Sequence, residues 1–258
     1  MFSFPSRARS VGIRDARNTS RAAGNQGGGP AEVDEITRLV ENVKGWLTPQ
    51  EGRLLYALAR NCTGRGIIVE IGSWKGKSTI WLGKGSKAGK NIPIHAIDPH
   101  TGSPETWQMY GPVWTFDEFR SNIHAANLDG LVIPLRQTSE EAARSFEGAV
   151  ELIFIDGAHE YEMVRLDFEL WFPKVVDGGI MAFHDADSPG PRAVVEKCVL
   201  KSRHFRHGRF VDSILVAEKV SRASLKDRFR NSCTLMSRRR YLPQPIRGIA
   251  RRIGEWGA

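Results

Sequence analysis

Two acidic residues and two histidines stand directly after apolar runs in the second half of the chain. Asp156 follows the run LIFI and is itself followed by His159, and the pair His184–Asp185 follows the run IMAF. Short apolar runs of this kind are typical of buried strands. Ligands bind at the carboxyl ends of parallel strands, so we expect these four side chains to converge at one edge of a sheet.

These residue types could carry a proton transfer beside a metal ion. Carboxylates from neighbouring strands, here Asp156 and Asp185, are typical ligands of Mg²⁺, and His184 could be a further ligand or could orient Asp185. His159 could act as a general base, because an imidazole ordinarily titrates near neutral pH. Aspartates after strands also serve as helix caps and histidines as structural hydrogen-bond partners, so the sequence leaves both interpretations open.

A glycine turn lies upstream, in the stretch IIVEIGSWKGKST. The apolar run that begins at Ile67 is closed by Glu70, and a turn with Gly72 and Gly76 leads into an apolar segment of helical character. A second apolar run then ends at Asp98. A strand, a glycine turn, a helix and a strand with a terminal acid are the layout of a nucleotide-cofactor half-site, in which the acid binds the ribose.

Two classes of ligand compete for this turn. The phosphate-binding P-loop of a nucleoside triphosphatase needs four residues between its glycines. Here only Ser73, Trp74 and Lys75 separate Gly72 from Gly76. The charge of Glu70 would repel a pyrophosphate and attract the sulfonium and ammonium groups of S-adenosylmethionine (SAM). The spacing and the acid therefore favour SAM over a nucleoside triphosphate.

The order of apolar runs predicts an α/β protein with a parallel sheet covered by helices on both faces. Residues 31–220 are expected to form this domain, with a last strand in VDSILVAEK that pairs as a hairpin with residues near Phe205. Residues 1–30 are rich in Ser, Arg and Gly and are expected to be disordered. Residues 221–258 are expected to be a basic tail, with helices over 222–240 and 246–256.

Local patterns predict several further features. Thr48, Pro49 and Glu51 have the spacing of a capping box, Thr115 is expected to cap another helix, and the DGG of residues 177–179 predicts a turn. The segment 100–114 is rich in Gly, Pro and aromatic residues. It could form a lid over a substrate or simply pack on the surface.

Composition and charge limit the remaining possibilities. The chain has 258 residues and a net charge of +8, and its three cysteines are far apart, which suits a reducing compartment such as the cytoplasm. Residues 1–30 hold five Arg and one Asp, and residues 221–258 hold ten Lys or Arg and two acids, so the segment between them is net acidic. A nucleic-acid substrate is therefore not expected. The basic C-terminal tail could contact a membrane surface, or it could simply be solvated.

The stretches VEIGSWKGKST, LIFIDGAHEY and DGGIMAFHD, with the strand ending at Asp98, resemble the class I SAM-dependent methyltransferases. More narrowly, they resemble the bacterial small-molecule O-methyltransferases that include macrolide-sugar O-methyltransferases and cephalosporin hydroxylase-like proteins. The resemblance covers about residues 66–218. It implies a Rossmann-like fold with a seven-stranded, mostly parallel sheet whose last strand is antiparallel.

The resemblance also implies roles for individual residues. It places Glu70, Gly72 and Ser73 at the methionine end of SAM, Gly76, Ser78 and Thr79 at the start of the helix, Asp98 at the ribose, and Gln137, Thr138 and Ser139 at the adenine. It makes Asp156 a Mg²⁺ ligand beside the cofactor, His159 the base and Asp185 a second metal ligand. A third acidic ligand of the macrolide-sugar enzymes has no counterpart that the sequence identifies. Catechol-type relatives carry Asp-Asn where this chain has His184–Asp185.

The function implied is the transfer of a methyl group from SAM to a hydroxyl of a small molecule, such as a sugar, a glycosylated natural product or a glycolipid. Association into a homo-oligomer is an open expectation. A P-loop-like nucleoside triphosphatase and a methyltransferase-like fold that acts only as a binding module through its basic tail remain the alternatives.

Overall fold

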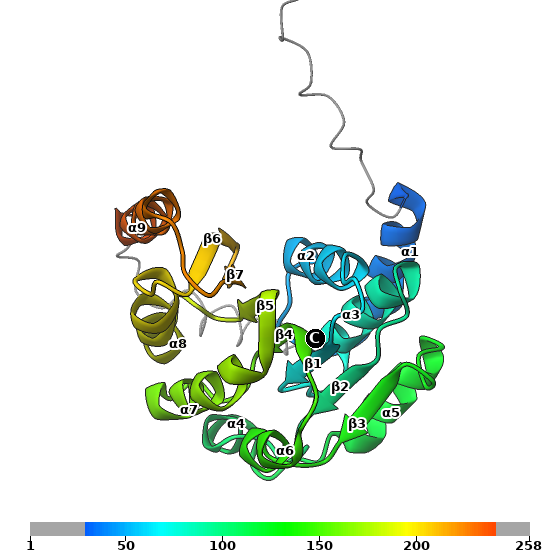
Figure 1. Cartoon of the computed structure of the whole chain (residues 1–258). Helices are drawn as coiled ribbons and strands as arrows, with labels where there is room; N and C mark the ends of the chain where they lie inside the picture. Colours follow the sequence, from blue (N-terminus) through cyan, green and yellow to red (C-terminus); the bar gives the residue numbers. More distant parts are fainter. Residues whose placement is uncertain (1–28, 241–258) are drawn as a thin grey trace, which may run out of the picture.

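A seven-stranded sheet forms the centre of the computed structural model, which describes residues 29–240 (Figure 1). Its strands are β1 (Ile67–Ile71), β2 (Ile94–Ile97), β3 (Val132–Leu135), β4 (Val150–Ile155), β5 (Val175–Phe183), β6 (Phe205–Val211) and β7 (Ile214–Lys219). Their order in the sheet is β3-β2-β1-β4-β5-β7-β6. The first five pair in parallel, and β7 is antiparallel to both β5 and β6. The predicted sheet and the predicted terminal hairpin are confirmed.

Helices cover both faces of this sheet, as predicted (Figure 1). They are α1 (Pro30–Glu41), α2 (Pro49–Arg60), α3 (Lys77–Ala88), α4 (Pro104–Tyr110), α5 (Phe116–Ala125), α6 (Ser139–Ser145), α7 (Tyr161–Trp171), α8 (Pro189–Val194) and α9 (Leu225–Arg240), with a 3₁₀ turn over Phe172–Lys174 and a π-helical turn over Val195–Leu200. Because side chains alternate along a strand, Phe154 belongs to the core that includes residues of α1, α2, α3 and α5. Ile153 belongs to the core on the other face, which includes residues of α6, α7, α8 and α9.

The capping box at the start of α2 forms as the sequence predicts. Glu51 accepts a hydrogen bond from the backbone N–H of Thr48, and the Thr48 hydroxyl accepts one from the N–H of Glu51. This motif fixes the first turn of α2 above the carboxyl ends of the strands. It thereby sets the position of the Glu51 carboxylate.

Two local predictions are wrong. Thr115 precedes α5 but makes no side-chain cap, because its Oγ1 lies 3.0 Å from Nδ1 of the buried His100. The DGG segment belongs to β5 instead of forming a turn before it, and Gly178 there has a φ of 78°. The register between β4 and β5 shifts at this point, so the extra residues form an irregularity within the strand.

The segment 100–114 contains the short helix α4, and the basic tail begins as a helix, as predicted. Helix α9 packs on β6, where the Asn231 side chain accepts from the N–H of Gly208 and donates to the carbonyl of Phe205. The packed body thus extends past residue 220. The expected disorder of residues 1–30 and the expected helix over 246–256 concern residues that lie almost wholly outside the described part. No helix within residues 29–240 has the length and apolar character needed to cross a membrane.

Candidate active site

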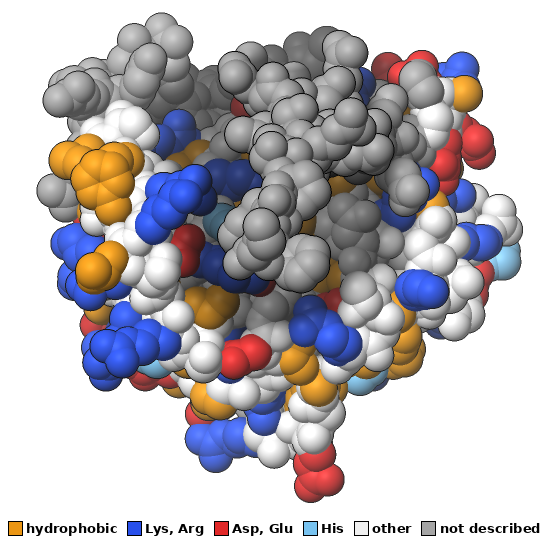
Figure 2. Space-filling model, turned by 45° about the horizontal axis from the view of Figure 1, so that its top comes forward, with side chains coloured by type: hydrophobic (Ala, Val, Ile, Leu, Met, Phe, Trp, Pro, Cys, Tyr) orange, Lys and Arg blue, Asp and Glu red, His pale blue; other side chains and the backbone are white. Residues whose placement is uncertain are grey.

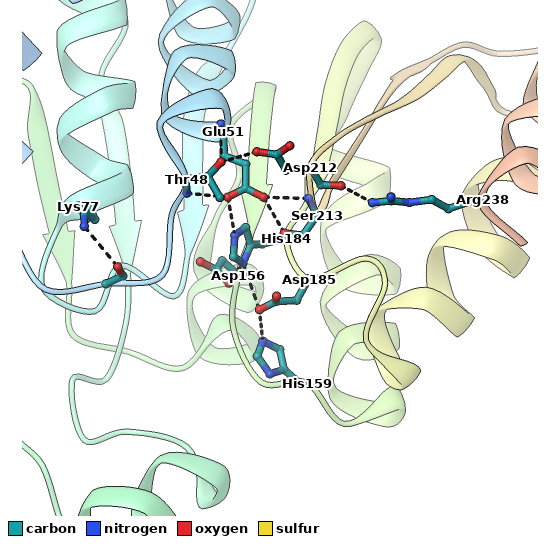
Figure 3. A network of polar contacts seen from close by, with 11 residues as sticks. Thr48, Glu51, Lys77, Asp156, His159, His184, Asp185, Asp212, Ser213 and Arg238 are labelled. Atoms are coloured by element: carbon teal, nitrogen blue, oxygen red, sulfur yellow. Dashed lines mark hydrogen bonds and ion pairs between the residues drawn. The ribbon is translucent and has the colours of Figure 1, made fainter. Parts of the chain in front are cut away.

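His184 lies at the centre of a cluster of three carboxylates at the carboxyl end of the sheet (Figure 3). Its Nδ1 lies 3.0 Å from Asp156 Oδ1 and 3.2 Å from Asp185 Oδ2, and its Nε2 lies 3.5 Å from Glu51 Oε2. The residue is buried. Burial alone would lower the pKa of His184, but the charge of Asp156 and the nearby carboxylates of Asp185 and Glu51 raise it well above 6.5. The imidazole is therefore a buried cation at neutral pH.

His159 reaches this cluster from the loop between β4 and α7. Its Nε2 lies 3.2 Å from Asp185 Oδ2, and a quarter of its side chain is exposed. Burial would raise the pKa of Asp185, but the hydrogen bonds from His159 and His184 lower it below the ordinary value. The expected convergence of Asp156, His159, His184 and Asp185 is confirmed, and the structure shows that Asp185 orients the His159 ring.

Glu51 belongs to this cluster although the sequence indicated only its capping role. The N–H and hydroxyl of Ser213 donate to its Oε1 at 2.9 and 2.7 Å. Burial would raise its pKa, but the bond from His184 and the other donors lower that pKa to about 2. The only available signal was the N3 position of a capping box, which carries no information about a distant histidine.

The donor set of this cluster fits a divalent cation. A carboxylate oxygen of Asp156, a carboxylate oxygen of Asp185 and a ring nitrogen of His184 lie within 4.8 Å of one another. The buried Nδ1 of His184 has no hydrogen bond of good geometry among the described residues, despite the two nearby carboxylates. The two carboxylate oxygens suit Mg²⁺ or Mn²⁺, whereas the imidazole nitrogen is a ligand that softer transition metals prefer. A cation there would replace the proton of His184.

The glycine turn after β1 lies directly against the strand end that carries Asp156. Gly72 has a φ of 86°, and a Cβ on it would lie 2.0 Å from the backbone oxygen of Asp156. Only glycine fits this close approach. Asp98, at the end of the adjacent β2, accepts hydrogen bonds from the N–H groups of Trp74 and His100. The turn, Asp98 and the strand end that carries Asp156 therefore meet at one place.

Glu70 lies beneath this turn and has no exposed surface. Thr79 donates to its Oε2, and Ser78 also hydrogen-bonds the carboxyl. Burial raises the pKa of Glu70 to about 8, so the group is mostly neutral at pH 7. The charge argument against a pyrophosphate is therefore weaker than the sequence suggested. The buried Glu70 Oε1 and Ser73 Oγ have no partner among the described residues, so a polar ligand group could satisfy them.

Two residues beside the turn bear on the nature of the ligand. The Lys77 ammonium donates to the carbonyl of Gly45 at 3.4 Å, so it points to the loop before α2 (Figure 3). Trp74 has a φ of 46°, an unusual conformation for a bulky residue that often marks a functional loop. Its ring lies 5.9 Å from that of Trp46. Lys77, the lysine that a P-loop would direct at phosphates, thus has a backbone carbonyl outside the turn as its partner.

The residues expected at the adenine follow β3, which is adjacent to β2. Gln137 is exposed, and Thr138 caps α6 in a second capping box with Glu141. Ser139 Oγ accepts a hydrogen bond from Nε1 of Trp171 at 2.9 Å. Their role at the adenine stays a prediction, since two of the three side chains already have structural partners.

Comparison with known proteins places the fold. Residues 69–186 match a family model described as a methyltransferase domain. A curated relative, the uncharacterized protein y4gI of Sinorhizobium fredii, is 41% identical over 54 residues, a stretch that spans 20% of this chain and 6% of that relative. The sequence match to this relative is therefore local.

Solved structures share the fold over most of their length. The O-methyltransferase from Bacillus cereus, solved in complex with SAH, has a TM-score of 0.52 at 20% identity and covers 73% of this chain and 91% of its own. The O-methyltransferase NovP has a TM-score of 0.54 at 17% identity, covering 73% of this chain and 79% of its own. Residues 69–186 thus resemble a methyltransferase domain, and the likeness to the two solved structures shows that this chain has the fold of class I methyltransferases.

Proposed function

We propose that this protein transfers the methyl group of SAM to a hydroxyl of a small molecule. The observation that carries the proposal is the His159–Asp185 pair, whose closest atoms are 3.2 Å apart. It lies at a strand end that adjoins the cofactor turn at Gly72. An oriented histidine beside a bound sulfonium is what removal of a hydroxyl proton during methyl transfer requires.

The cofactor would be held by the turn and by the neighbouring strand ends. Asp98 offers a carboxylate for the ribose hydroxyls, and the buried Ser73 Oγ and Glu70 Oε1 offer polar atoms that the described residues do not satisfy. Gly72 and Gly76 let the backbone approach the ligand closely. Gln137, Thr138 and Ser139 would lie at the adenine side. The solved relative from Bacillus cereus binds SAH in a domain of the same fold.

His159 would take the proton in the chemical step. With its Nε2–H directed at Asp185, its Nδ1 accepts the proton of the acceptor hydroxyl. The acceptor oxygen then forms a bond to the methyl carbon as the bond from that carbon to the sulfonium sulfur breaks, which leaves a neutral thioether. Asp185 stabilises the imidazolium that results. Near-attack positioning of oxygen and methyl would supply much of the acceleration.

A divalent cation, Mg²⁺ by the expectation from the sequence, would be held by Asp156, Asp185 and His184. When bound, it would lower the pKa of a coordinated hydroxyl by Lewis-acid action. The role of this chain is to provide the two carboxylates from adjacent strands and to fix His184 through Glu51. The buried charge of the cluster is then balanced by a metal ion in place of a proton.

The segment around α4 would supply the acceptor surface. Trp107, Tyr110 and Trp114 are 49%, 43% and 50% exposed, respectively. Exposed aromatic rings that follow the ribose-binding strand suit the flat apolar face of a sugar ring. We therefore favour a sugar, a glycosylated natural product or a glycolipid as the acceptor.

The proposal is tested by incubating the full chain with methyl-labelled SAM and a panel of sugars, glycosides and glycolipids. Formation of SAH together with a labelled acceptor is the expected result, and the reaction is repeated with EDTA and with added Mg²⁺ or Mn²⁺. Calorimetric binding of SAH without methylation of any acceptor would favour a binding module. If calorimetry detected binding of ATP but no binding of SAH, the cofactor assignment would be overturned.

A further inference from the structure

The outer face of α9 carries an exposed apolar stripe. Leu225, Phe229 and Met236 are 81%, 68% and 53% exposed, respectively. Their spacing places them on one side of the helix, away from the buried Asn231, which bonds to β6 on the body of the domain. The direction of the stripe is therefore fixed by the packing of α9 on β6.

Basic side chains flank this stripe on both sides. At 100° per residue, Lys226 lies on one side of the stripe and Arg228 on the other, and both are exposed. Figure 2 shows basic and hydrophobic side chains next to each other on the side of the molecule that carries α9. A helix with an apolar centre and basic edges is typical of segments that lie in the interface of an anionic membrane.

A pocket of about 360 Å³ opens at the start of α9. It is lined by Arg203, Arg222 and Arg228, together with Ser224 and Leu225. Within residues 29–240, none of these three arginines has an acidic side chain at ion-pair distance.

Some other arginines of the domain have their charge balanced by a neighbouring glutamate. Arg144, Arg165, Arg192 and Arg206 each pair with a glutamate, at distances between 2.5 and 3.2 Å. The three arginines of the pocket, in contrast, gather positive charge around one hollow. A phosphate group matches both the charge and the donors of such a site.

We propose that this face binds the surface of an anionic phospholipid membrane. A lipid phosphate occupies the arginine pocket, and Leu225, Phe229 and Met236 enter the boundary between headgroups and acyl chains. The apolar stripe decides between a membrane and a nucleic acid. Leu225 and Met236 cannot stack on bases, and an exposed apolar patch of this kind needs an apolar partner. The inference does not depend on the methyl-transfer reaction.

The experiment is vesicle co-sedimentation of the full chain. The vesicles are made of phosphatidylcholine alone or with about a third of phosphatidylglycerol, and a single-stranded RNA oligomer serves as a soluble polyanion. One variant carries Leu225→Ser and Phe229→Ser, and another carries Arg203→Gln, Arg222→Gln and Arg228→Gln. The matched controls are Met163→Ser, an exposed methionine on α7, and the triple variant K87Q/K90Q/R144Q, which removes three positive charges from places outside α9 and its pocket.

The wild-type chain and both controls are expected to bind the anionic vesicles and to leave the neutral ones in solution. Each test variant should bind the anionic vesicles roughly tenfold more weakly or worse, because it loses either the apolar contact or the charge. Circular dichroism checks that α9 is retained. Unchanged binding of the serine variant, equal loss in the controls, or RNA binding that outcompetes vesicles would each overturn the proposal.

Discussion

The Nε2 atom of His184 lies 3.5 Å from Oε2 of Glu51, and both side chains are almost fully buried. The contact joins the end of β5 to the first turn of α2, across 133 residues of sequence. It connects the helix that covers the site with the cluster of Asp156, Asp185 and His159. A buried cation held by three carboxylates couples the stability of the domain to the geometry of its candidate active site.

Substituting Glu51→Gln should destabilise the domain by about 3 kcal/mol at pH 7, because it leaves the buried His184 cation without one of its partners. The folded-state pKa of Glu51, about 2, is below the ordinary 4.5. Its contribution is therefore fully present above pH 4.5 and is lost as the pH falls towards 2. Urea unfolding of both proteins at pH 7 and pH 3 measures the difference, which should shrink at pH 3.

The matched control is Glu141→Gln, the N3 glutamate of the exposed capping box on α6. It removes the same group from the same motif without a buried histidine nearby, so its effect should be clearly smaller. Equal effects of the two substitutions would mean that Glu51 acts only as a helix cap.

Substituting His159→Gln should leave the binding of SAH unchanged and lower turnover by a factor on the order of 10²–10⁴, since it removes the general base. The control is His124→Gln, because His124 forms a similar pair with Asp129 at 3.1 Å on the far end of α5. Single-turnover methylation and calorimetry separate the chemical step from binding. A variant that retains full turnover would exclude His159 as the base.

Substituting Asp98→Ala should weaken SAH binding by roughly 10- to 100-fold, the range for a charged hydrogen-bonding group. The substitution also removes the acceptor of the N–H groups of Trp74 and of the buried His100, so circular dichroism checks that the fold persists. Calorimetry gives the affinity, and the exposed Asp34→Ala is the control. An unchanged affinity would remove the ribose role.

Substituting Glu70→Gln should change how stability depends on pH. The folded-state pKa of Glu70, about 8, is above the ordinary 4.5. The wild type therefore loses stability as the pH rises from 4.5 through 8, by an amount on the order of 3–5 kcal/mol, whereas the glutamine variant does not. The free energy of unfolding at pH 5, 7 and 9 gives the comparison. Parallel profiles for the two proteins would show that Glu70 does not titrate in this range.

The strand ends of the site could be predicted from the sequence. Asp98, Asp156 and Asp185 each follow an apolar run, and the parallel pairing of such runs brings their carboxyl ends to one edge of the sheet. The glycine turn could also be predicted. The turn lies so close to the strand carrying Asp156 that position 72 must be a glycine, and that glycine is visible in the sequence. These features depend on local pattern and on the geometry that all parallel sheets share.

Other contacts depend on how separate elements pack, and no local pattern encodes them. The sequence left open whether His159 would face Asp156 or Asp185, and loop geometry directs it to Asp185. It showed Glu51 as a helix cap, whereas the packing of α2 over the end of β5 makes it a partner of His184. The sequence by itself thus determined which groups at the ends of the strands meet at the edge of the sheet. The tertiary structure alone decided which of them are buried and paired, because burial and pairing arise from the packing of helices on the sheet.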